Sequence, residues 1–359
     1  AVSRLLGWWL IDNCPSPERC SPVTREQLFD LSRLPDEFGP VAARIEAGAL
    51  VVDWSHGEGS SRFDPGWLSA HDYGAGYDGE DRPEPRLWRA ADMPEPPTVE
   101  GARILEDDQA LEDWLSAVAV YGFGRLRDAP RAPGDVERIC ARIGTIRETN
   151  FGRVFDVRAR LDADSAAYLP VPLEGHVDLP TREYQPGLQA LHCLENTTAG
   201  GLATMADGFA IAEALRAADP SAFETLTERP MVFANRAKST DYRWRAPAIG
   251  LDRAGRYVEV RVGPFLRGPQ AERPERMAEL YRAIRAITRL ARDPAFQTQY
   301  AYAPGDLVLF DNRRLLHGRT AYDGAQGARW LQGVYLERDE LYSRLRMLRR
   351  AKRAAMVGG

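Results

Sequence analysis

Two histidines and one carboxylate in this sequence have the types and spacing of a metal site. His176 and Asp178 are two residues apart, and His317 stands far downstream in a chain with only five histidines. In an extended segment, residues two apart share one face, so His176 and Asp178 could bind one ion together. Two histidines and one carboxylate on one face of a metal form the facial triad of non-haem Fe(II) oxygenases. The sequence therefore predicts metal ligands at His176, Asp178 and His317.

Arg329 follows His317 by 12 residues (329 − 317 = 12), which leaves room for a loop and a return along the next strand. A guanidinium there could hold the distal carboxylate of a bidentate co-substrate through two parallel hydrogen bonds. A purely structural metal needs no such arginine, which argues against a catalytically inactive metal-binding sensor. Two histidines and a carboxylate also suit catalytic zinc, but no general base stands beside His176 for a zinc hydrolase.

The composition is that of a globular chain without a nucleic-acid surface. The 359 residues are 44% hydrophobic and carry a formal net charge of −5, and the basic residues are dispersed. No basic stripe, membrane-spanning run or signal segment is apparent. We therefore expect a cytoplasmic protein that acts on a small molecule, with no nucleic-acid or membrane partner. Its four cysteines have no regular spacing, which favours reduced thiols.

The elements that must position these residues suggest two domains. Residues 1–90 predict a small β-rich domain with a linker rich in Gly, Pro and acidic residues. Residues 91–359 predict an α+β domain built on a double-stranded β-helix, or jelly roll. Apolar spacing predicts helices that start at Asp107 or Asp108 and after Gly134, and helices over 207–218 and 274–292. Short strands are predicted over 49–54, 122–126, 189–194, 231–234, 257–262, 306–310 and 330–335.

The motifs together resemble one enzyme family. His176-x-Asp178, the run from Phe310 to Arg319 and Arg329 resemble the gamma-butyrobetaine dioxygenase and trimethyllysine dioxygenase family, which is similar to taurine dioxygenase. The likeness covers nearly the whole chain and includes the runs 9–14, 148–153 and 343–346. It implies Fe(II) on the three ligands, 2-oxoglutarate on Arg329, and O2 at the last metal position. It also implies release of succinate and CO2, hydroxylation of an unactivated C–H bond, and a homodimer.

The resemblance also suggests a substrate class. In the family, an aromatic cage attracts a trimethylammonium group, and its positions fall here on Phe151, Phe155, Tyr168 and Tyr335. A quaternary-ammonium or otherwise cationic metabolite is therefore expected. The alternative is a natural-product tailoring oxygenase, which would hydroxylate or desaturate an apolar substrate packed on these rings.

Two substrate-carboxylate asparagines of the relatives fall here on Ser165 and around Gly263-Pro264. A different acidic end of the substrate, met by an arginine, is therefore our hypothesis. The candidate arginines are Arg243, Arg245 and Arg267.

Two further family features are altered in this chain. Thr204 ends the run Gly200-Gly201-Leu202-Ala203-Thr204 one residue later than the family's hydroxyl, which on a strand turns it to the other face. Thr204 is nevertheless our candidate for a further 2-oxoglutarate contact. The family's N-terminal zinc site uses three cysteines and one histidine, and here only Cys14, Cys20 and His56 are available. Because structural zinc needs four protein ligands, zinc is not expected.

Overall fold

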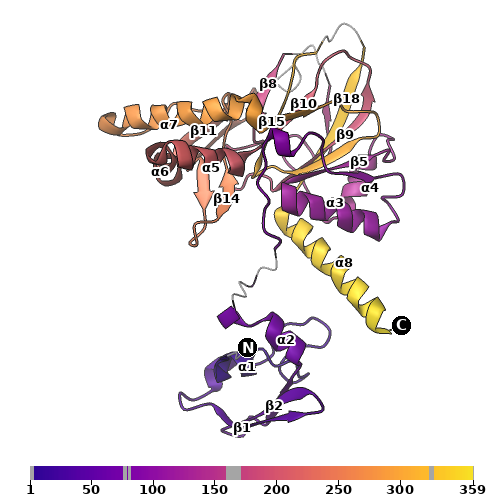
Figure 1. The fold of residues 1–359 in the computed structure, drawn as a ribbon, viewed down its shortest axis with the longest axis vertical. Coiled ribbons are helices and arrows are strands. Elements are labelled where there is room, and N and C mark those ends of the chain that lie inside the picture. Colours follow the sequence, from indigo (N-terminus) through magenta and orange to yellow (C-terminus); the bar gives the residue numbers. More distant parts are fainter. Residues whose placement is uncertain (1–3, 76–78, 80–81, 159–170, 323–326, 359) are drawn as a thin grey trace. The chain divides into compact units, whose positions relative to one another are not determined.

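The structure, a computed structural model, describes residues 4–75, 79, 82–158, 171–322 and 327–358. The chain divides into two units, Ala1–Asp81 and Arg82–Gly359 (Figure 1). Residues 82–90 belong to the second unit and not to the predicted first domain of residues 1–90, because Trp88 anchors them there. Its ring lies 5.3 Å from the ring of Phe123, and its indole N–H donates to the carbonyl of Tyr121 at 2.8 Å.

The first unit is a small antiparallel sheet with short helices. The order of its strands is β1-β2-β3, and β2 over Ala49–Trp54 has the predicted bounds. Its core contains the buried side chains of Ile11, Phe38, Trp54 and Phe63. The elements are α1 (Gly7–Asp12), η1 (Leu31–Arg33), β1 (Pro40–Glu46), β2 (Ala49–Trp54), β3 (Ser60–Phe63), α2 (Pro65–Ala70) and η2 (Tyr73–Ala75).

The second unit contains two larger sheets, in which every pairing is antiparallel except that of β4 with β5. The first sheet has the order β4 (Thr98–Glu100), β5 (Phe123–Arg127), β16 (Leu307–Asp311), β9 (Leu188–Asn196), β18 (Arg329–Leu336) and β6 (Ile146–Arg147), and β7 (Phe155–Val157) also pairs with β18. The second sheet has the order β15 (Gln297–Tyr300), β10 (Ala203–Asp207), β17 (Leu315–Arg319) and β8 (Leu173–His176).

Strand alternation divides the first sheet into a helix-covered face and a face that borders the site. On β9, Leu188 and Ala190 pack against α3 (Asp108–Tyr121), α4 (Asp135–Ala141) and α8 (Arg338–Gly358), which lie on one side of this unit in Figure 1. Gln189 and Leu191 point the opposite way and line a cavity. The mixed α and β content and the antiparallel sheets agree with the predicted class.

A helical group packs beside the second sheet. Asp207 and Asp219 cap α5 and α6, since their carboxylates accept hydrogen bonds from Phe209 N and Ala222 N, both at 3.0 Å. The sequence analysis missed α6, although an aspartate before Pro220 is a helix-start signal. The group contains α5 (Gly208–Ala218), α6 (Pro220–Glu228), β11 (Met231–Arg236), β12 (Asp241–Ala246), β13 (Ile249–Leu251), β14 (Tyr257–Val260) and α7 (Pro274–Arg292). Within the described part of the chain, no helix has the length and apolar character to cross a bilayer.

The buried His192 on β9 predicts loss of stability in acid. Neither of its ring nitrogens has a hydrogen-bond partner among the described residues, and burial lowers the pKa of His192 to about 4. An unfolded histidine titrates near 6.5, so protons bind the unfolded chain first as the pH falls. The free energy of unfolding should therefore decrease between about pH 6.5 and 4, by about 3 kcal/mol from this residue. Urea unfolding of wild type and His192→Gln at pH 8, 6 and 5 measures this decrease in the free energy of unfolding. An equal pH dependence of the two proteins would contradict the prediction.

Candidate active site

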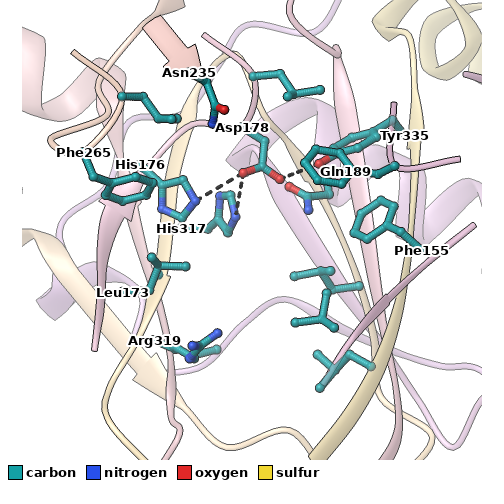
Figure 2. A pocket seen from close by; sticks show the side chains of 18 of the residues that line it. Phe155, Leu173, His176, Asp178, Gln189, Asn235, Phe265, His317, Arg319 and Tyr335 are labelled. Atoms are coloured by element: carbon teal, nitrogen blue, oxygen red, sulfur yellow. Dashed lines mark hydrogen bonds and ion pairs between the residues drawn. The ribbon is translucent and has the colours of Figure 1, made fainter. Parts of the chain in front are cut away.

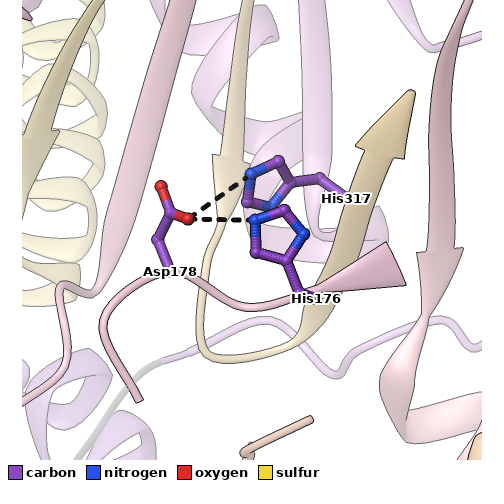
Figure 3. Close-up of side chains that lie close together, drawn as sticks. All are labelled: His176, Asp178 and His317. Carbon is purple, nitrogen blue, oxygen red and sulfur yellow. Dashed lines mark ion pairs between the residues drawn. The ribbon is translucent and has the colours of Figure 1, made fainter. Parts of the chain in front are cut away.

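The three predicted metal ligands meet at the edge of the second sheet (Figure 3). His176 on β8 and His317 on β17 are direct cross-strand partners, with ring centroids 4.3 Å apart. Asp178 Oδ1 lies 3.2 Å from His176 Nε2 and 3.8 Å from His317 Nε2. Their potential ligand atoms all lie within 4.8 Å of one another, which no other three such side chains in the described residues achieve. The donor set fits one metal ion of the facial-triad type.

Asp178 reaches this point by a turn and not along a strand. β8 ends at His176, and Leu179 has a left-handed φ of 54°. The expectation that His176 and Asp178 share one strand face is therefore wrong, although the two side chains do converge. The buried Asn312 holds the turn, because it accepts from Asp178 N at 2.7 Å and donates to Asp178 O at 3.0 Å.

The protonation of the cluster suits metal binding. His176 Nδ1 lies 2.8 Å from the carbonyl of Glu174, which can only accept, so Nδ1 donates there and Nε2 is the nitrogen that faces Asp178. Burial, followed by the charge of His176, lowers the pKa of His317 to about 3. Burial alone would raise the pKa of Asp178, but His317, His176 and Tyr335 together hold it well below its usual value. At neutral pH Asp178 is anionic and His317 is neutral, the states that a metal requires of its ligands.

A cavity of about 380 Å³ opens from the ligands toward an aromatic wall. Phe155 stacks on Tyr335 with ring centroids 5.0 Å apart, and Phe151 lies 6.1 Å from Phe155. Figure 2 shows Phe155 and Tyr335 on one side of Asp178 and the two histidines on the other. Three of the four predicted cage positions therefore line the cavity, while Tyr168 and Ser165 lie outside the described residues.

Gly333 on β18 makes room for this wall. A Cβ atom at position 333 would lie 2.4 Å from the ring atom Cζ of Phe155, which is closer than carbon atoms approach. Phe155 can therefore lie over β18 only because residue 333 has no side chain. This constraint could not be seen in the sequence, since it depends on the pairing of β7 with β18.

Arg329 lines the same cavity. In the part of the chain that the structure describes, its buried Nε has no hydrogen-bond partner and its guanidinium forms no ion pair. Its guanidinium carbon lies 5.7 Å from the centre of the Tyr322 ring. A buried cation of this kind is costly unless an anion pairs with it, so Arg329 can receive a carboxylate.

Thr204 is not among the residues that line the cavity. Its neighbours Ala203 and Met205 do line it, and Thr204 lies on the other face of β10, where its Oγ1 would contact a Cβ atom at Gly318 at 2.8 Å. The structure therefore does not bring Thr204 to this cavity, and its contact with 2-oxoglutarate stays a prediction. The one-residue displacement of the hydroxyl has the effect that strand alternation predicts.

The three arginines proposed for the acidic end of the substrate also lie off this cavity. Arg243 forms two hydrogen bonds with Asp241, at 2.9 and 2.8 Å, and Arg245 donates to the carbonyl of Ala271. Arg267 borders a different, small cavity. The arginine that β11 contributes to the cavity is Arg236, beside Asn235, and sequence reasoning missed both.

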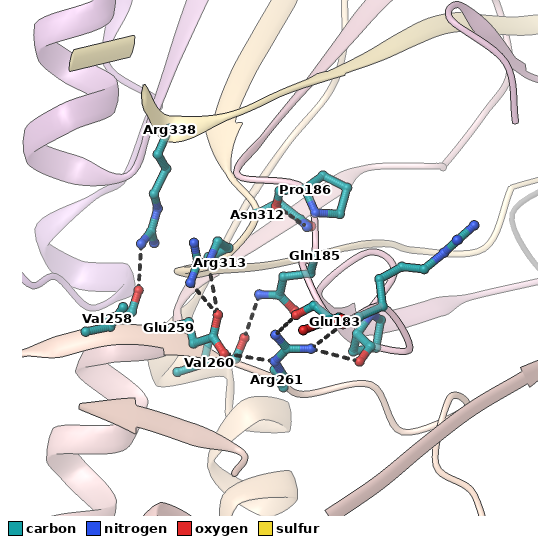
Figure 4. A network of polar contacts seen from close by, with 12 residues as sticks. Glu183, Gln185, Pro186, Val258, Glu259, Val260, Arg261, Asn312, Arg313 and Arg338 are labelled. Atoms are coloured by element: carbon teal, nitrogen blue, oxygen red, sulfur yellow. Dashed lines mark hydrogen bonds and ion pairs between the residues drawn. The ribbon is translucent and has the colours of Figure 1, made fainter. Parts of the chain in front are cut away.

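A buried polar network fixes the segment that follows Asp178 (Figure 4). Arg261 donates to the carbonyls of Pro180, Arg182 and Glu183 at 3.1, 2.8 and 3.0 Å. Glu259 accepts from Arg261 at 2.9 Å and from Arg313 at 2.7 Å, which balances the buried charge. These carbonyls have no strand partner, so the Arg261 guanidinium supplies the hydrogen bonds that a neighbouring strand would otherwise donate.

The described residues of the first unit bring together no group of three metal donors. Arg19, which stands next to Cys20, pairs with Glu58 at 3.4 Å, and its guanidinium lies 4.7 Å from the centre of the Phe29 ring. Cys14 and Cys20 border one cavity of this unit, and neither His56 nor a further donor completes a group of three among its described residues. That the unit binds no zinc stays a prediction, which metal analysis tests.

Comparison with known proteins identifies the class. The model of the family described as "Taurine catabolism dioxygenase TauD, TfdA family" matches residues 80–335, and the chain belongs to this family. A solved structure, a putative alpha-ketoglutarate-dependent taurine dioxygenase from Burkholderia xenovorans, has the same fold with a TM-score of 0.52 at 14% identity, over 70% of this chain and 91% of that one.

Individual relatives are similar to this chain over nearly its whole length. A gamma-butyrobetaine dioxygenase from Pseudomonas sp. (strain AK-1) is 44% identical over 97% of this chain and 91% of its own length. The human gamma-butyrobetaine dioxygenase is 29% identical over 95% of this chain and 90% of its own, and a trimethyllysine dioxygenase from Meyerozyma guilliermondii is 29% identical over 97% and 91%. The predicted family is confirmed, and the chain is an Fe(II)- and 2-oxoglutarate-dependent dioxygenase.

Proposed function

We propose that the protein hydroxylates an unactivated C–H bond of a small quaternary-ammonium or otherwise cationic metabolite, while 2-oxoglutarate is converted to succinate and CO2. The observation that carries this proposal is that the metal donors and the aromatic wall of Phe151, Phe155 and Tyr335 border one cavity. The names of the relatives support it, since gamma-butyrobetaine and trimethyllysine both contain a quaternary ammonium group.

In this proposal each described residue has one role. His176, Asp178 and His317 hold Fe(II), which supplies the activation of O2 when it is bound. Arg329 pairs with the distal carboxylate of 2-oxoglutarate and so orients the co-substrate toward the ligands. The two large sheets form the double-stranded β-helix, and the small N-terminal unit is a separate β-rich domain.

The aromatic wall selects a cation that cannot donate hydrogen bonds. The faces of aromatic rings are electrostatically negative because of the ring quadrupole. Their attraction for a cation is largest where water is excluded. The wall is also bordered by Leu191 and Leu331, which would exclude water from the bound group. An apolar natural product would fit the same rings without using this electrostatic attraction.

Matched substrates distinguish these two possibilities. Purified enzyme with Fe(II) and 2-oxoglutarate is assayed for succinate with a panel of trimethylammonium compounds and with neutral analogues in which carbon replaces the charged nitrogen. Stimulation by the cations alone supports the proposal. Equal or greater stimulation by the neutral analogues favours a tailoring oxygenase, and no stimulation by either favours an inactive sensor.

The acidic end of the substrate is assigned to Asn235 and Arg236. Both line the cavity, and Arg236 forms no ion pair with another described residue. Its cross-strand partner Asp241 is already bound through both carboxylate oxygens by Arg243. Arg236 attracts Asp241 electrostatically, but a carboxylate, phosphonate or similar anion on the substrate could still contact its guanidinium from the cavity.

Arg236→Leu should raise the KM for an anionic betaine by roughly tenfold, because one charge-assisted hydrogen bond contributes about 1.5 kcal/mol. The KM for 2-oxoglutarate should not change. Arg243→Leu is the matched control, since Arg243 is exposed and lies off the cavity. Steady-state kinetics measures both variants, and an equal KM increase in the two would exclude Arg236 as the anion contact.

A further inference from the structure

Asp178 is the metal ligand with the least support from the sheet, yet its backbone is held firmly. Both its N–H and its carbonyl bond to the amide of Asn312, at 2.7 and 3.0 Å. Asn312 is fully buried and also donates to the carbonyl of Pro186 at 3.0 Å (Figure 4). The position of the Asp178 backbone is therefore set, and what remains is the orientation of its carboxylate.

Tyr335 determines that orientation. Its hydroxyl donates to Asp178 Oδ2 at 2.6 Å, whereas Oδ1 faces the Nε2 atoms of His176 and His317 (Figure 2). A hydrogen bond this short to an ionised carboxylate is of the strong, charge-assisted kind. Because the phenol occupies Oδ2, Oδ1 is the oxygen that is left for a metal.

The number of carboxylate oxygens on the metal matters for this class of enzyme. An aspartate that binds through one oxygen occupies one coordination position, and an aspartate that chelates occupies two. A facial triad keeps its remaining positions open for a bidentate co-substrate and O2. A hydrogen bond that reserves Oδ2 would therefore keep one of those positions open when a metal is bound.

Tyr335 is also part of the aromatic wall. Its ring is buried and stacks on Phe155 at an interplanar angle of 28°. A group that packs on the ring of Tyr335 therefore contacts the same residue whose hydroxyl orients the metal ligand. A shift of the ring would therefore also change the hydrogen bond from its hydroxyl to Asp178.

We propose that Tyr335 is a positioning residue that keeps Asp178 a one-oxygen ligand and couples occupation of the aromatic wall to the metal centre. The coupling rests on the proposed function, because it requires a substrate at the wall. The positioning of Asp178 does not, because it concerns metal binding in the absence of substrate.

Tyr335→Phe tests the proposal, since it removes the hydroxyl and keeps the ring. Tyr257→Phe is the matched control: Tyr257 likewise donates to a carboxylate at 2.6 Å, that of Glu213, but does not line the cavity. Mn(II) affinity is measured without O2 by electron paramagnetic resonance, and thermal unfolding verifies that both variants are folded. With O2 and Fe(II), 2-oxoglutarate consumption is compared with hydroxylated product.

Tyr335→Phe is expected to bind Mn(II) roughly tenfold more weakly than wild type, while Tyr257→Phe is unchanged. It should also consume more 2-oxoglutarate per product formed. Mn(II) affinities equal to wild type would overturn the proposal. If wild type binds Mn(II) but no quaternary ammonium compound stimulates succinate release, the proposed substrate is wrong, whereas a tenfold loss in Tyr335→Phe still supports the positioning of Asp178.

Discussion

His317→Ala is expected to abolish metal-dependent turnover. The substitution leaves Asp178 and His176 as a two-residue site, which lacks one of the three donors that converge within 4.8 Å. Even residues that only hydrogen-bond to metal ligands change affinity by 10- to 100-fold, so loss of a ligand should exceed roughly a hundredfold. Mn(II) titration and succinate release at saturating 2-oxoglutarate measure the two effects.

His56→Asn is the control for this variant. His56 lies in the first unit, and asparagine tolerates its left-handed φ of 57°. Metal content and turnover should equal those of wild type. Retention of one metal per chain by His317→Ala, together with loss of it by His56→Asn, would move the metal site to the other unit.

Arg329→Lys should raise the KM for 2-oxoglutarate by roughly a hundredfold and leave the KM for the primary substrate unchanged. Lysine keeps the charge but cannot make two parallel hydrogen bonds to one carboxylate, a loss of about 3 kcal/mol in the buried setting of Arg329. The effect should be confined to the co-substrate, because Arg329 is assigned to 2-oxoglutarate and not to the aromatic wall.

Initial-rate kinetics with each substrate varied in turn tests this specificity. Arg243→Lys is the control variant, because it makes the same substitution at an arginine that lies off the cavity. An unchanged KM for 2-oxoglutarate in Arg329→Lys would refute the assigned role. A rise in both KM values would instead indicate that Arg329 shapes the whole cavity.

The metal donors could be predicted from the sequence because histidine is scarce in this chain. The chain has only five histidines, and one stands in His176-x-Asp178 and another in the run Phe310–Arg319, which resemble motifs of a known family. The geometry of the site could not be predicted from the sequence. The turn at Leu179, which has a left-handed φ, is fixed by Asn312 from a distant segment. Gln189 and Arg236 were missed for a similar reason, because long-range strand pairing brings them to the cavity.

Helices and strands were predicted correctly where their local sequence patterns were strong. α7 has the predicted bounds, because a long amphipathic repeat starts at Pro274 and ends with Arg292. β8, β10, β15 and β17 were not predicted, although they form the sheet that carries two metal ligands. They are short, and β10 is largely alanine and methionine, so their extended state depends on partners far away in the chain.

β8 lies at the edge of its sheet and pairs with β17 at only two register positions, one of which is the pair His176 and His317. A metal on these residues would join two strands whose ligands are 141 residues apart (317 − 176 = 141). Such an ion acts as a removable cross-link, and its binding free energy adds to that of folding, by about 2.7 kcal/mol at a concentration of 100 times its Kd. Removal of the ion would take away this cross-link at an edge where β8 is otherwise held by two register pairs.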